Sequence, residues 1–376
     1  MNPSIRLGRI FGIPFGVNWS WLVVLGLITW TLGSGVFPNQ NPGLGKATYY
    51  TMAIIAALAF FVALLLHELG HALVARREGI EIEGITLWLF GGVARFEQLF
   101  PSAGAELRVA VAGPLVTLVF GGICVAVSVL LSLPSAVDGV FAWLGYINLL
   151  LLVFNLIPAL PLDGGRILRS LLWRIKGEYA WATIRAALAG RAFGLLMIGG
   201  GIALFIFQGA FSGVWFAFIG WFLLQASTTE LRGLALKDAL HGLKALNVMT
   251  RDPVTLSPDA RLGEALDALS VSERHSAYPV VDDGRPLGLL SMGTLAAVPR
   301  EQWEDHRVRD FMLDLGQVPT IDAEADAVDA VAPLQGNQLR QTLVLEDGRL
   351  AGVLTLSDLA DAVELRRPIR PRRARR

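Results

Sequence analysis

The chain has 376 residues, and its 32 lysines and arginines balance its 32 aspartates and glutamates. Because the net charge is zero, the whole-chain balance gives no sign of a nucleic-acid or other acidic partner. With 53% hydrophobic and only 17% charged residues, the sequence is too apolar for an average soluble protein. Its one cysteine, Cys124, excludes an intrachain disulfide.

Long apolar runs fill the chain up to about Ala226, and the composition beyond Leu231 is that of a soluble protein. A membrane-spanning helix needs about 20 apolar residues. Six segments meet this requirement: 16–36, 51–75, 107–132, 140–160, 186–208 and 212–230. The N-terminal segment lacks a small-residue cleavage site, so we expect it to remain as the first span and not to be removed as a signal peptide.

Basic residues flank these segments on one side only. They are Arg6, Arg9, Arg76, Arg77, Arg166, Arg169, Arg174, Lys176, Arg185, Arg232 and Lys237. The loops on the other side contain Lys46 alone. By the positive-inside rule, we expect a protein of the cell membrane with both termini in the cytoplasm. The alternative, that a segment such as 140–160 is a buried helix of a soluble protein, does not explain this alternation.

The second segment contains HELGH at residues 67–71. Residues four apart lie on the same face of a helix, so His67 and His71 can offer ring nitrogens to one cation. Glu68 is adjacent to the first histidine and can reach a water molecule on that cation. This spacing is the pattern of zinc metalloproteases. The alternative is a pair of hydrogen-bonded histidines in the helix packing.

A hydrolytic zinc site needs a third protein ligand and one open position. The other three histidines all follow residue 240, so we expect a carboxylate ligand. Asp163 stands out because it lies just after the fourth segment, where Pro158 and Pro161 interrupt helical hydrogen bonding. The glycines at 164–165 permit a tight turn that could direct the carboxylate inward. The alternative for Asp163 is a helix-capping role.

Two segments of the soluble part repeat one pattern with a period of roughly 60 residues. Each contains an amphipathic helix, then an apolar strand, an Asp-Gly turn, a second strand and a helix. The turns are Asp283-Gly284 and Asp347-Gly348, which predict β-hairpins. The pair resembles a tandem cystathionine-β-synthase-type (CBS) module from Leu246 to Leu365, with its two units packed face to face.

Such modules commonly bind adenine nucleotides through a threonine or serine and an aspartate after the hairpin. The resemblance therefore implies an ATP, ADP or AMP site at Thr355 and Asp358 of the second repeat. The first repeat keeps Ser291 but has Thr294 at the acidic position, so we expect at most one site of this kind. The alternative is a dimerisation module without a ligand, and a homodimer through the CBS modules is compatible with both.

HELGH on one membrane segment and NLIPALPLDGG at 155–165 on a later one resemble the site-2 protease family of intramembrane zinc metalloproteases. The chain is similar to the bacterial and archaeal members with six spans and C-terminal CBS repeats. The matching motif residues are Asn155, Pro158, Leu162, Asp163 and Gly164, with AGP at 112–114 and FGG at 90–92.

The resemblance implies one Zn²⁺ per chain, bound by His67, His71 and Asp163. It also implies that Glu68 activates the attacking water and that Asn155 stabilises the substrate carbonyl or oxyanion. The alternative for Asn155 is hydrogen bonding between helices. The implied substrate is a membrane-anchored protein, such as an anti-sigma factor or a membrane-tethered transcription factor, and no nucleic acid is expected as a partner.

The segment Gly84–Gln98 is rich in β-forming residues. We interpret it as a membrane-associated hairpin that could pair with an extended substrate; the alternative is a hairpin that only packs. The expected fold is thus an α-helical polytopic membrane domain of six transmembrane helices with a small membrane-associated β-hairpin, followed by a cytoplasmic α/β tandem CBS module. The boundaries are 1–232 for the membrane domain, 233–245 for a linker, 246–305 and 306–365 for the repeats, and 366–376 for a disordered basic tail.

One competing function belongs to another class. A transporter or channel regulated by its CBS pair could use intramembrane histidine and aspartate as ion or proton ligands. A hydrolase requires Glu68 beside the first metal ligand, whereas a proton relay does not. The Glu68 position therefore favours the protease.

Overall fold

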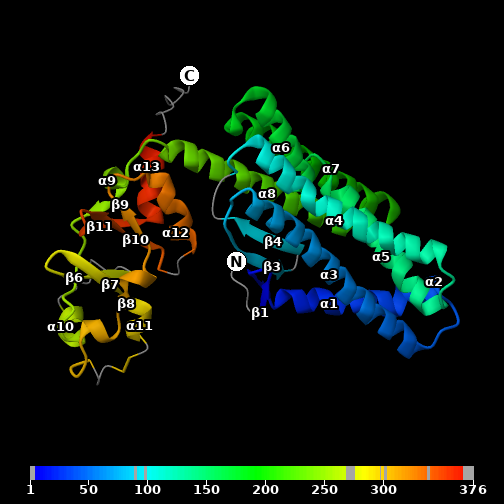
Figure 1. Cartoon of the computed structure of the whole chain (residues 1–376), viewed down its shortest axis with the longest axis horizontal. Coiled ribbons are helices and arrows are strands. Elements are labelled where there is room, and N and C mark those ends of the chain that lie inside the picture. Colours follow the sequence, from blue (N-terminus) through cyan, green and yellow to red (C-terminus); the bar gives the residue numbers. More distant parts are fainter. Residues whose placement is uncertain are drawn as a thin grey trace. The chain divides into compact units, whose positions relative to one another are not determined.

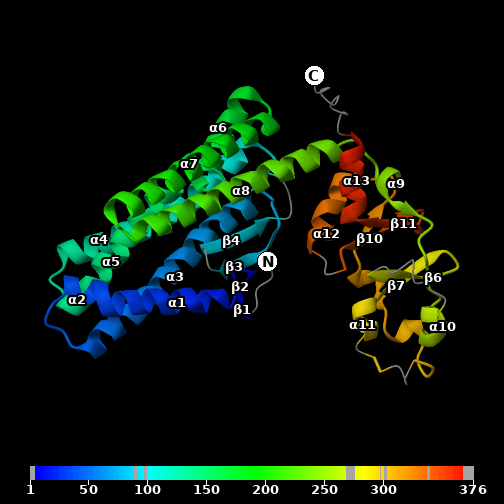
Figure 2. The same ribbon diagram turned by 180° about the vertical axis from the view of Figure 1, so that it is seen from behind.

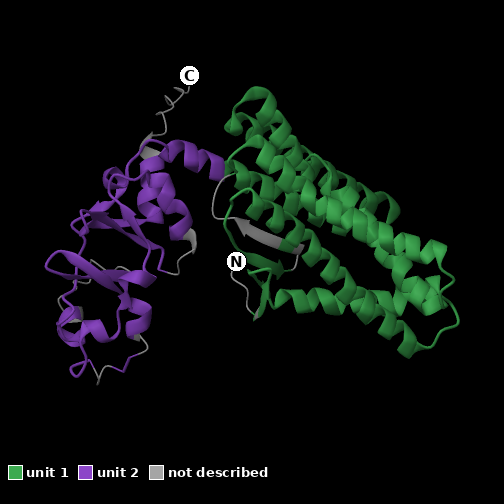
Figure 3. Ribbon diagram, in the orientation of Figure 1, with its two compact units in different colours: residues 1–232 green, residues 233–376 purple. Residues whose placement is uncertain are grey.

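The computed structural model describes residues 5–88, 91–96, 100–267, 276–296, 298–299, 303–336 and 339–366. The chain divides into two compact units, Met1–Arg232 and Gly233–Arg376 (Figure 3). Phe90, Gln98, His275 and the tail from 367 onward lie outside the described residues, and so do the expectations that concern them.

A four-stranded sheet packs on the third helix of the first unit (Figure 1). Its strands are β1 (Ile5–Ile10), β2 (Ile13–Val17), β3 (Ile82–Trp88) and β4 (Gly91–Phe96), in the order β1-β2-β3-β4. The hairpin expected at 84–98 is present as β3 and β4 in its described part. The hairpin of β1 and β2 was not expected, because an apolar N-terminal sequence is equally compatible with a strand pair and a helix. Ile13 and Ile85 of the sheet are buried against Leu69 of α3.

Five helical segments of the described chain are long and apolar enough to cross a membrane. The first, Ser20–Gln40, consists of α1 (Ser20–Thr31), a π-helical turn (Leu32–Val36) and α2 (Phe37–Gln40). The others are α3 (Lys46–Arg77), α4 (Ala103–Leu130), α5 (Ser135–Asn155) and α7 (Tyr179–Gln208). The expected first span was placed too early, because residues 13–17 pair in the sheet.

The fourth expected span ends earlier than predicted. Helix α5 stops at Asn155, and residues 156–162 form an irregular loop before α6 (Asp163–Lys176). Asp163 therefore begins a new helix and does not end a kinked one. Gly164 and Gly165 lie in the first turn of α6, where an added Cβ would be 2.3 Å from Leu156 O and 2.2 Å from Leu160 N, respectively. These glycines let the loop lie directly on the helix.

Helix α8 (Ser212–Leu240) contains the sixth expected span but is not among the five that meet the length and apolarity requirement. It lies along α7 (Figure 2). Glycines of the two helices pack closely where they meet. A Cβ on Gly201 would be 2.4 Å from Gly213 O, and one on Gly194 would be 2.8 Å from Gly220 O. The two backbones therefore approach each other as closely as in small-residue contacts between membrane helices.

The second unit contains two small sheets. One has the order β5-β11-β10-β9, with β5 at Thr250–Arg251, β9 at Thr320–Asp322, β10 at Gln341–Glu346 and β11 at Arg349–Thr355. The other has the order β6-β7-β8, at Ala277–Asp282, Arg285–Ser291 and Leu313–Asp314. Short helices accompany them: α9 (Ala245–Val248), α10 (Leu262–Asp267), α11 (Met292–Ala296), α12 (Val331–Gly336) and α13 (Leu356–Arg366).

Both Asp-Gly turns form the predicted hairpins. Asp283 and Gly284 have φ angles of 47° and 80°, and Asp347 and Gly348 have φ angles of 52° and 75°. Two successive positive φ values are typical of a type I′ turn, whose backbone twist matches the twist of the two flanking strands. Leu289 of the first repeat and Leu343 of the second are fully buried in one cluster, so the two repeats share a core.

Candidate metal centre

Three side chains from two helices converge inside the first unit. His67 and His71 lie one turn apart on α3, and their Nε2 atoms are 3.1 Å from each other. Asp163 Oδ2 is 3.1 Å from His67 Nε2, and Asp163 Oδ1 is 3.2 Å from His71 Nε2. Both imidazoles are buried, and the Asp163 side chain is 12% exposed. The carboxylate thus faces the two imidazoles.

Helix α4 holds the outer nitrogen of each imidazole. His67 Nδ1 is 2.8 Å from Thr117 Oγ1, and His71 Nδ1 donates to Val109 O at 2.7 Å. Since a carbonyl can only accept, the Val109 contact places a proton on His71 Nδ1. A neutral His71 therefore presents an unprotonated Nε2 to the other histidine and to a carboxylate oxygen. Such partners fix the ring orientation of metal-ligating histidines.

This donor set fits a zinc ion. His71 Nε2 and the carboxylate oxygens of Asp163 are acceptors, and a cation bound between them and His67 Nε2 would satisfy all three groups. Zinc bonds of about 2.0–2.2 Å in tetrahedral geometry separate neighbouring ligand atoms by about 3.3–3.6 Å. The observed separations of 3.1–3.2 Å are only slightly shorter. Two imidazoles and one carboxylate also leave one position open, as hydrolytic zinc requires.

Gly113 of α4 leaves the room for this cluster. A Cβ at this position would lie 2.3 Å from His71 Nε2 and 2.7 Å from His67 Nε2. Any side chain would therefore occupy the space where the ring nitrogens meet. The glycine of the AGP motif at 112–114 therefore has a structural role, which is to leave space for the two imidazoles. The sequence pattern alone did not explain this role.

The Glu68 side chain on α3 lies against strand β4 of the sheet. It is half-buried, and a Cβ on Gly92 of β4 would be 2.3 Å from Glu68 Cγ and 3.0 Å from its Oε1. The backbone of β4 therefore passes directly over the Glu68 carboxylate. Among the strands that the structure describes, β4 is the last of its sheet, so one edge of its backbone is not paired with any of them.

Asn155 is the last residue of α5 and is half-buried. The seven-residue loop 156–162 separates it from Asp163. The structure thus places Asn155 on the element that leads to the third candidate ligand.

Thr355 and Asp358 lie together in the second unit, at the junction of β11 and α13. Asp358 Oδ2 accepts hydrogen bonds from Thr355 N at 2.8 Å and from Thr355 Oγ1 at 2.7 Å. Its other oxygen accepts from Thr250 Oγ1 at 3.1 Å. In the first repeat, Ser291 Oγ accepts from Gly293 N at 3.1 Å. Both positions therefore have hydrogen-bond partners within their own repeat or its neighbouring strand.

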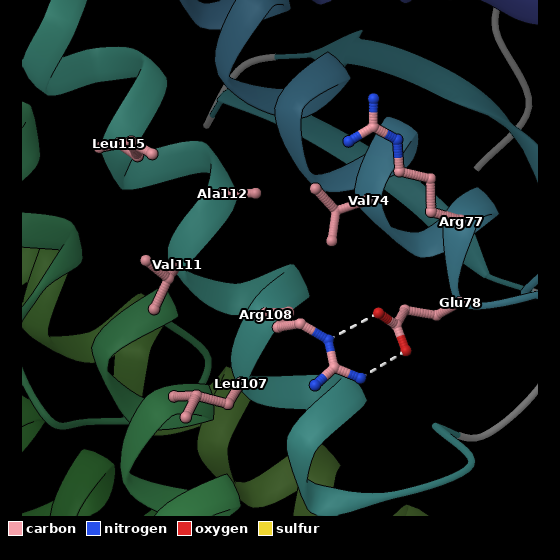
Figure 4. Close-up of a pocket in the computed structure, with 8 residues that line it drawn as sticks. All are labelled: Val74, Arg77, Glu78, Leu107, Arg108, Val111, Ala112 and Leu115. Atoms are coloured by element: carbon pink, nitrogen blue, oxygen red, sulfur yellow. Dashed lines mark hydrogen bonds and ion pairs between the residues drawn. The ribbon is translucent and has the colours of Figure 1, made fainter.

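A separate hollow of about 460 Å³ lies between the C-terminal end of α3 and the start of α4 (Figure 4). Its lining is mostly apolar, with Glu78 and Arg108 at one side. Arg108 donates to both Glu78 oxygens, at 2.6 and 2.7 Å, and this pairing holds the pKa of the Glu78 carboxyl below its usual range. None of the three candidate ligands lines this hollow.

Comparison with known proteins identifies the family of the chain. The profile of peptidase family M50 matches residues 55–135 and 131–199, and the CBS domain profile matches 244–301 and 308–365. Rip3 of Mycobacterium tuberculosis is 37% identical over 99% of this chain and 95% of its own length. The chain belongs to peptidase family M50, the site-2 proteases.

Other members of this family are also similar. The zinc metalloprotease MJ0392 of Methanocaldococcus jannaschii is 30% identical over 97% of both chains. A solved structure of the site-2 protease from the same organism is 33% identical and covers 61% of this chain and 95% of its own, with a TM-score of 0.42. The expected zinc metalloprotease with a CBS pair is thereby confirmed. The family profile and the sequence relatives favour the protease over a CBS-regulated transporter.

Proposed function

We propose that this site-2 protease hydrolyses peptide bonds within or near transmembrane segments of membrane-anchored proteins, with His67, His71 and Asp163 as the zinc ligands. The observation that carries the proposal is the convergence of two imidazole Nε2 atoms and one carboxylate within 3.1–3.2 Å of one another. Zinc bound there supplies a Lewis acid that lowers the pKa of a water molecule toward about 7.

The protein's own groups provide the proton transfers. Glu68 lies next to the ligand His67, with its carboxylate under β4, so it can accept a proton from the attacking water and return it to the leaving amine. Asn155, at the end of α5, is our candidate for hydrogen bonding to the carbonyl oxygen as negative charge develops on it. Burial of the two imidazoles excludes bulk water and strengthens these interactions.

Two variants test this assignment. Glu68→Gln should retain one zinc per purified chain and lose cleavage, because it removes the base but no ligand. Asp163→Ala should lose both, because two imidazoles alone hold only half of the site. Zinc is measured by elemental analysis of detergent-purified protein. Zinc retained in full by Asp163→Ala would refute the ligand set, and cleavage by Glu68→Gln would refute the role of Glu68.

The edge strand β4 supports a model of how substrate binds. A helical substrate hides its carbonyls in its own hydrogen bonds, whereas an extended one can add to a sheet edge. At Gly92, β4 lies against Glu68, so a strand paired to β4 would bring its backbone close to the base. Proline at Gly91 should abolish cleavage without loss of zinc, because proline cannot donate a backbone hydrogen bond. Cleavage at the wild-type rate would show that the hairpin only packs.

The proposed topology has six spans with both termini in the cytoplasm. The close packing of α8 on α7 and the exposed aromatic residues Trp215, Phe218 and Trp221 of α8 support its place in the membrane. The alternation of basic loops supports the orientation. The proposed boundaries remain 1–232, 233–245, 246–305, 306–365 and 366–376 for membrane domain, linker, repeats and tail.

The substrate class and the regulation are inferred more indirectly. One plant relative is named a membrane-bound transcription factor site-2 protease homolog, and it is 32% identical over 148 residues. A membrane-tethered transcription factor or an anti-sigma factor is therefore our proposed substrate. We also propose that adenine nucleotide binds at Thr355 and Asp358 and modulates cleavage, with homodimerisation through the CBS pair. Calorimetry with ATP, ADP and AMP tests this: binding should occur and should be lost in Asp358→Ala, whereas no binding to the wild type refutes it.

A further inference from the structure

A buried ion pair joins α4 to α6, away from the three candidate ligands. Arg169 donates from Nε at 2.7 Å and from a terminal nitrogen at 2.5 Å, both to Glu106 Oε1. Glu106 is fully buried and Arg169 is 5% exposed. Within the described chain, the second Glu106 oxygen has no hydrogen-bond partner. A buried ion pair contributes little net stability by itself, so its presence calls for another explanation.

The face of α4 that carries Glu106 is the face that orients the imidazoles. Glu106, Val109, Gly113 and Thr117 are spaced by three, four and four residues, which places them along one side of the helix. Val109 and Thr117 contact the outer imidazole nitrogens, and Gly113 leaves the space between the rings. The same side of α4 therefore sets the position of the histidines on α3 and, through Glu106, the position of α6.

Arg169 connects this face to the carboxylate ligand. It is six residues after Asp163 on the same helix, which is about 9 Å along the axis. At the other end of the ligand, the loop is held by Ser227 of α8, whose hydroxyl donates to Leu160 O at 2.6 Å. Asp163 thus lies between two anchored points, one in the loop and one in the helix.

We propose that Arg169 is a positioning residue, which through Glu106 fixes α6 on α4 so that Asp163 meets the two imidazoles at bonding distance. The proposal rests on the metal site proposed above. Two further groups face the guanidinium: Glu230 Oε2 at 3.7 Å and the Tyr179 ring, with 5.1 Å to its centroid. Arginine is required here because its planar fork directs two N–H groups at one carboxylate, whereas lysine supplies the charge without that geometry.

Arg169→Lys tests the proposal in the full-length protein. The charge is kept, so we expect the variant to fold, with a changed metal geometry. Zn²⁺ affinity, measured by competition with a chelator, should fall about tenfold, as for other residues that orient ligands. The absorption spectrum of the Co²⁺-substituted protein should change, and kcat should fall with KM unchanged. A purely structural role would lower the melting temperature and leave Zn²⁺ affinity and the Co²⁺ spectrum as in the wild type.

Two further variants separate a positioning role of Arg169 from a general effect on folding. Arg174→Lys changes an exposed arginine of the same helix and should match the wild type in every measurement. The double variant Arg169→Met with Glu106→Leu removes both buried charges, so it should fold even if Arg169→Lys does not, and it should show the same loss of Zn²⁺ affinity. Wild-type affinity and spectrum in a folded Arg169 variant overturn this inference alone. Absence of Zn²⁺ binding by the wild type would instead overturn the metal site and this inference together.

Discussion

At the scale of single residues, the proposed metal centre depends on groups other than its three candidate ligands. The Val109 carbonyl fixes the proton of His71 on Nδ1, and the Thr117 hydroxyl, on the same side of α4, contacts Nδ1 of His67. Gly113 contributes by having no side chain. Only His67, His71, Glu68 and Asp163 could be recognised from the sequence, because the chemistry of their side chains is visible in the sequence. A backbone carbonyl and a missing side chain have no such signature.

Gly113→Ala should remove most of the metal affinity. The added Cβ would be 2.3 Å from His71 Nε2, so the ring must turn or α4 must move away. We expect Zn²⁺ affinity to fall by about 100-fold, the upper part of the range for changes around metal ligands. The measurement is chelator competition on the purified protein.

Gly122→Ala on the same helix is the matched control. No heavy atom lies within 4 Å of the Cβ it would add, so affinity should not change. An equal loss in both variants would mean that alanine perturbs α4 as a whole, and equal retention would mean that Gly113 is not needed for space.

At the scale of elements, close contacts between glycines hold α8 against α7. Gly201 and Gly194 of α7 lie against Gly213 and Gly220 of α8, with backbone atoms in direct approach. Farther along, Ser227 of α8 reaches the loop that precedes Asp163. Helix α8 is thereby packed beside the loop that leads to Asp163. The apolar run at 212–230 predicted a span, but the sequence could not predict the contact of Ser227 with this loop.

Gly201→Val should separate the two helices. Its Cβ would be 2.4 Å from Gly213 O and 2.5 Å from Ala217 N, and backbone atoms cannot move aside as a flexible side chain can. Overpacking of this kind costs about 1–3 kcal/mol. We expect a lower melting temperature in detergent micelles, followed by circular dichroism.

Gly199→Val, two residues earlier on α7, has open space at the added Cβ and should melt close to the wild type. If both variants lose the same stability, the β-branched side chain and not the helix contact is responsible.

At the scale of the whole molecule, the chain contains two compact units with separate cores. Within the second unit, the repeats are not independent, because Leu289 of the first and Leu343 of the second are buried in one cluster. We therefore expect the fragment 233–376 to unfold in a single transition.

Leu343→Ala in that fragment tests this cooperativity. Removing a fully buried leucine costs about 2–5 kcal/mol, and the loss should be detected in the other repeat as well. Trp303 is the one tryptophan after residue 232, and it packs in the core of the first repeat. Its fluorescence should report the lowered urea midpoint of Leu343→Ala.

Leu287→Ala, at a position that is 36% exposed, is the control and should shift the midpoint much less. A Trp303 transition that is unaffected by Leu343→Ala would show that the repeats fold separately.

The sequence by itself determined the chemistry and the outline of the fold. HELGH needs only one helical turn to bring His67 and His71 together, and the Asp-Gly hairpins need only local backbone preferences. Such short-range features follow from neighbouring residues, so they could be predicted. The apolar runs likewise located five helices by composition, with errors at their ends where β2 and the loop 156–162 replace helix.

Only the tertiary structure decided what joins distant parts of the chain. Asp163 begins α6, and its carboxylate meets the imidazoles because α4 and α8 hold that helix and its loop in place. The partners of the outer imidazole nitrogens, the ion pair of Arg169 and the passage of β4 over Glu68 are contacts between elements. They depend on how whole helices and strands pack, and local sequence carries no record of which distant side chain or carbonyl will fill each space.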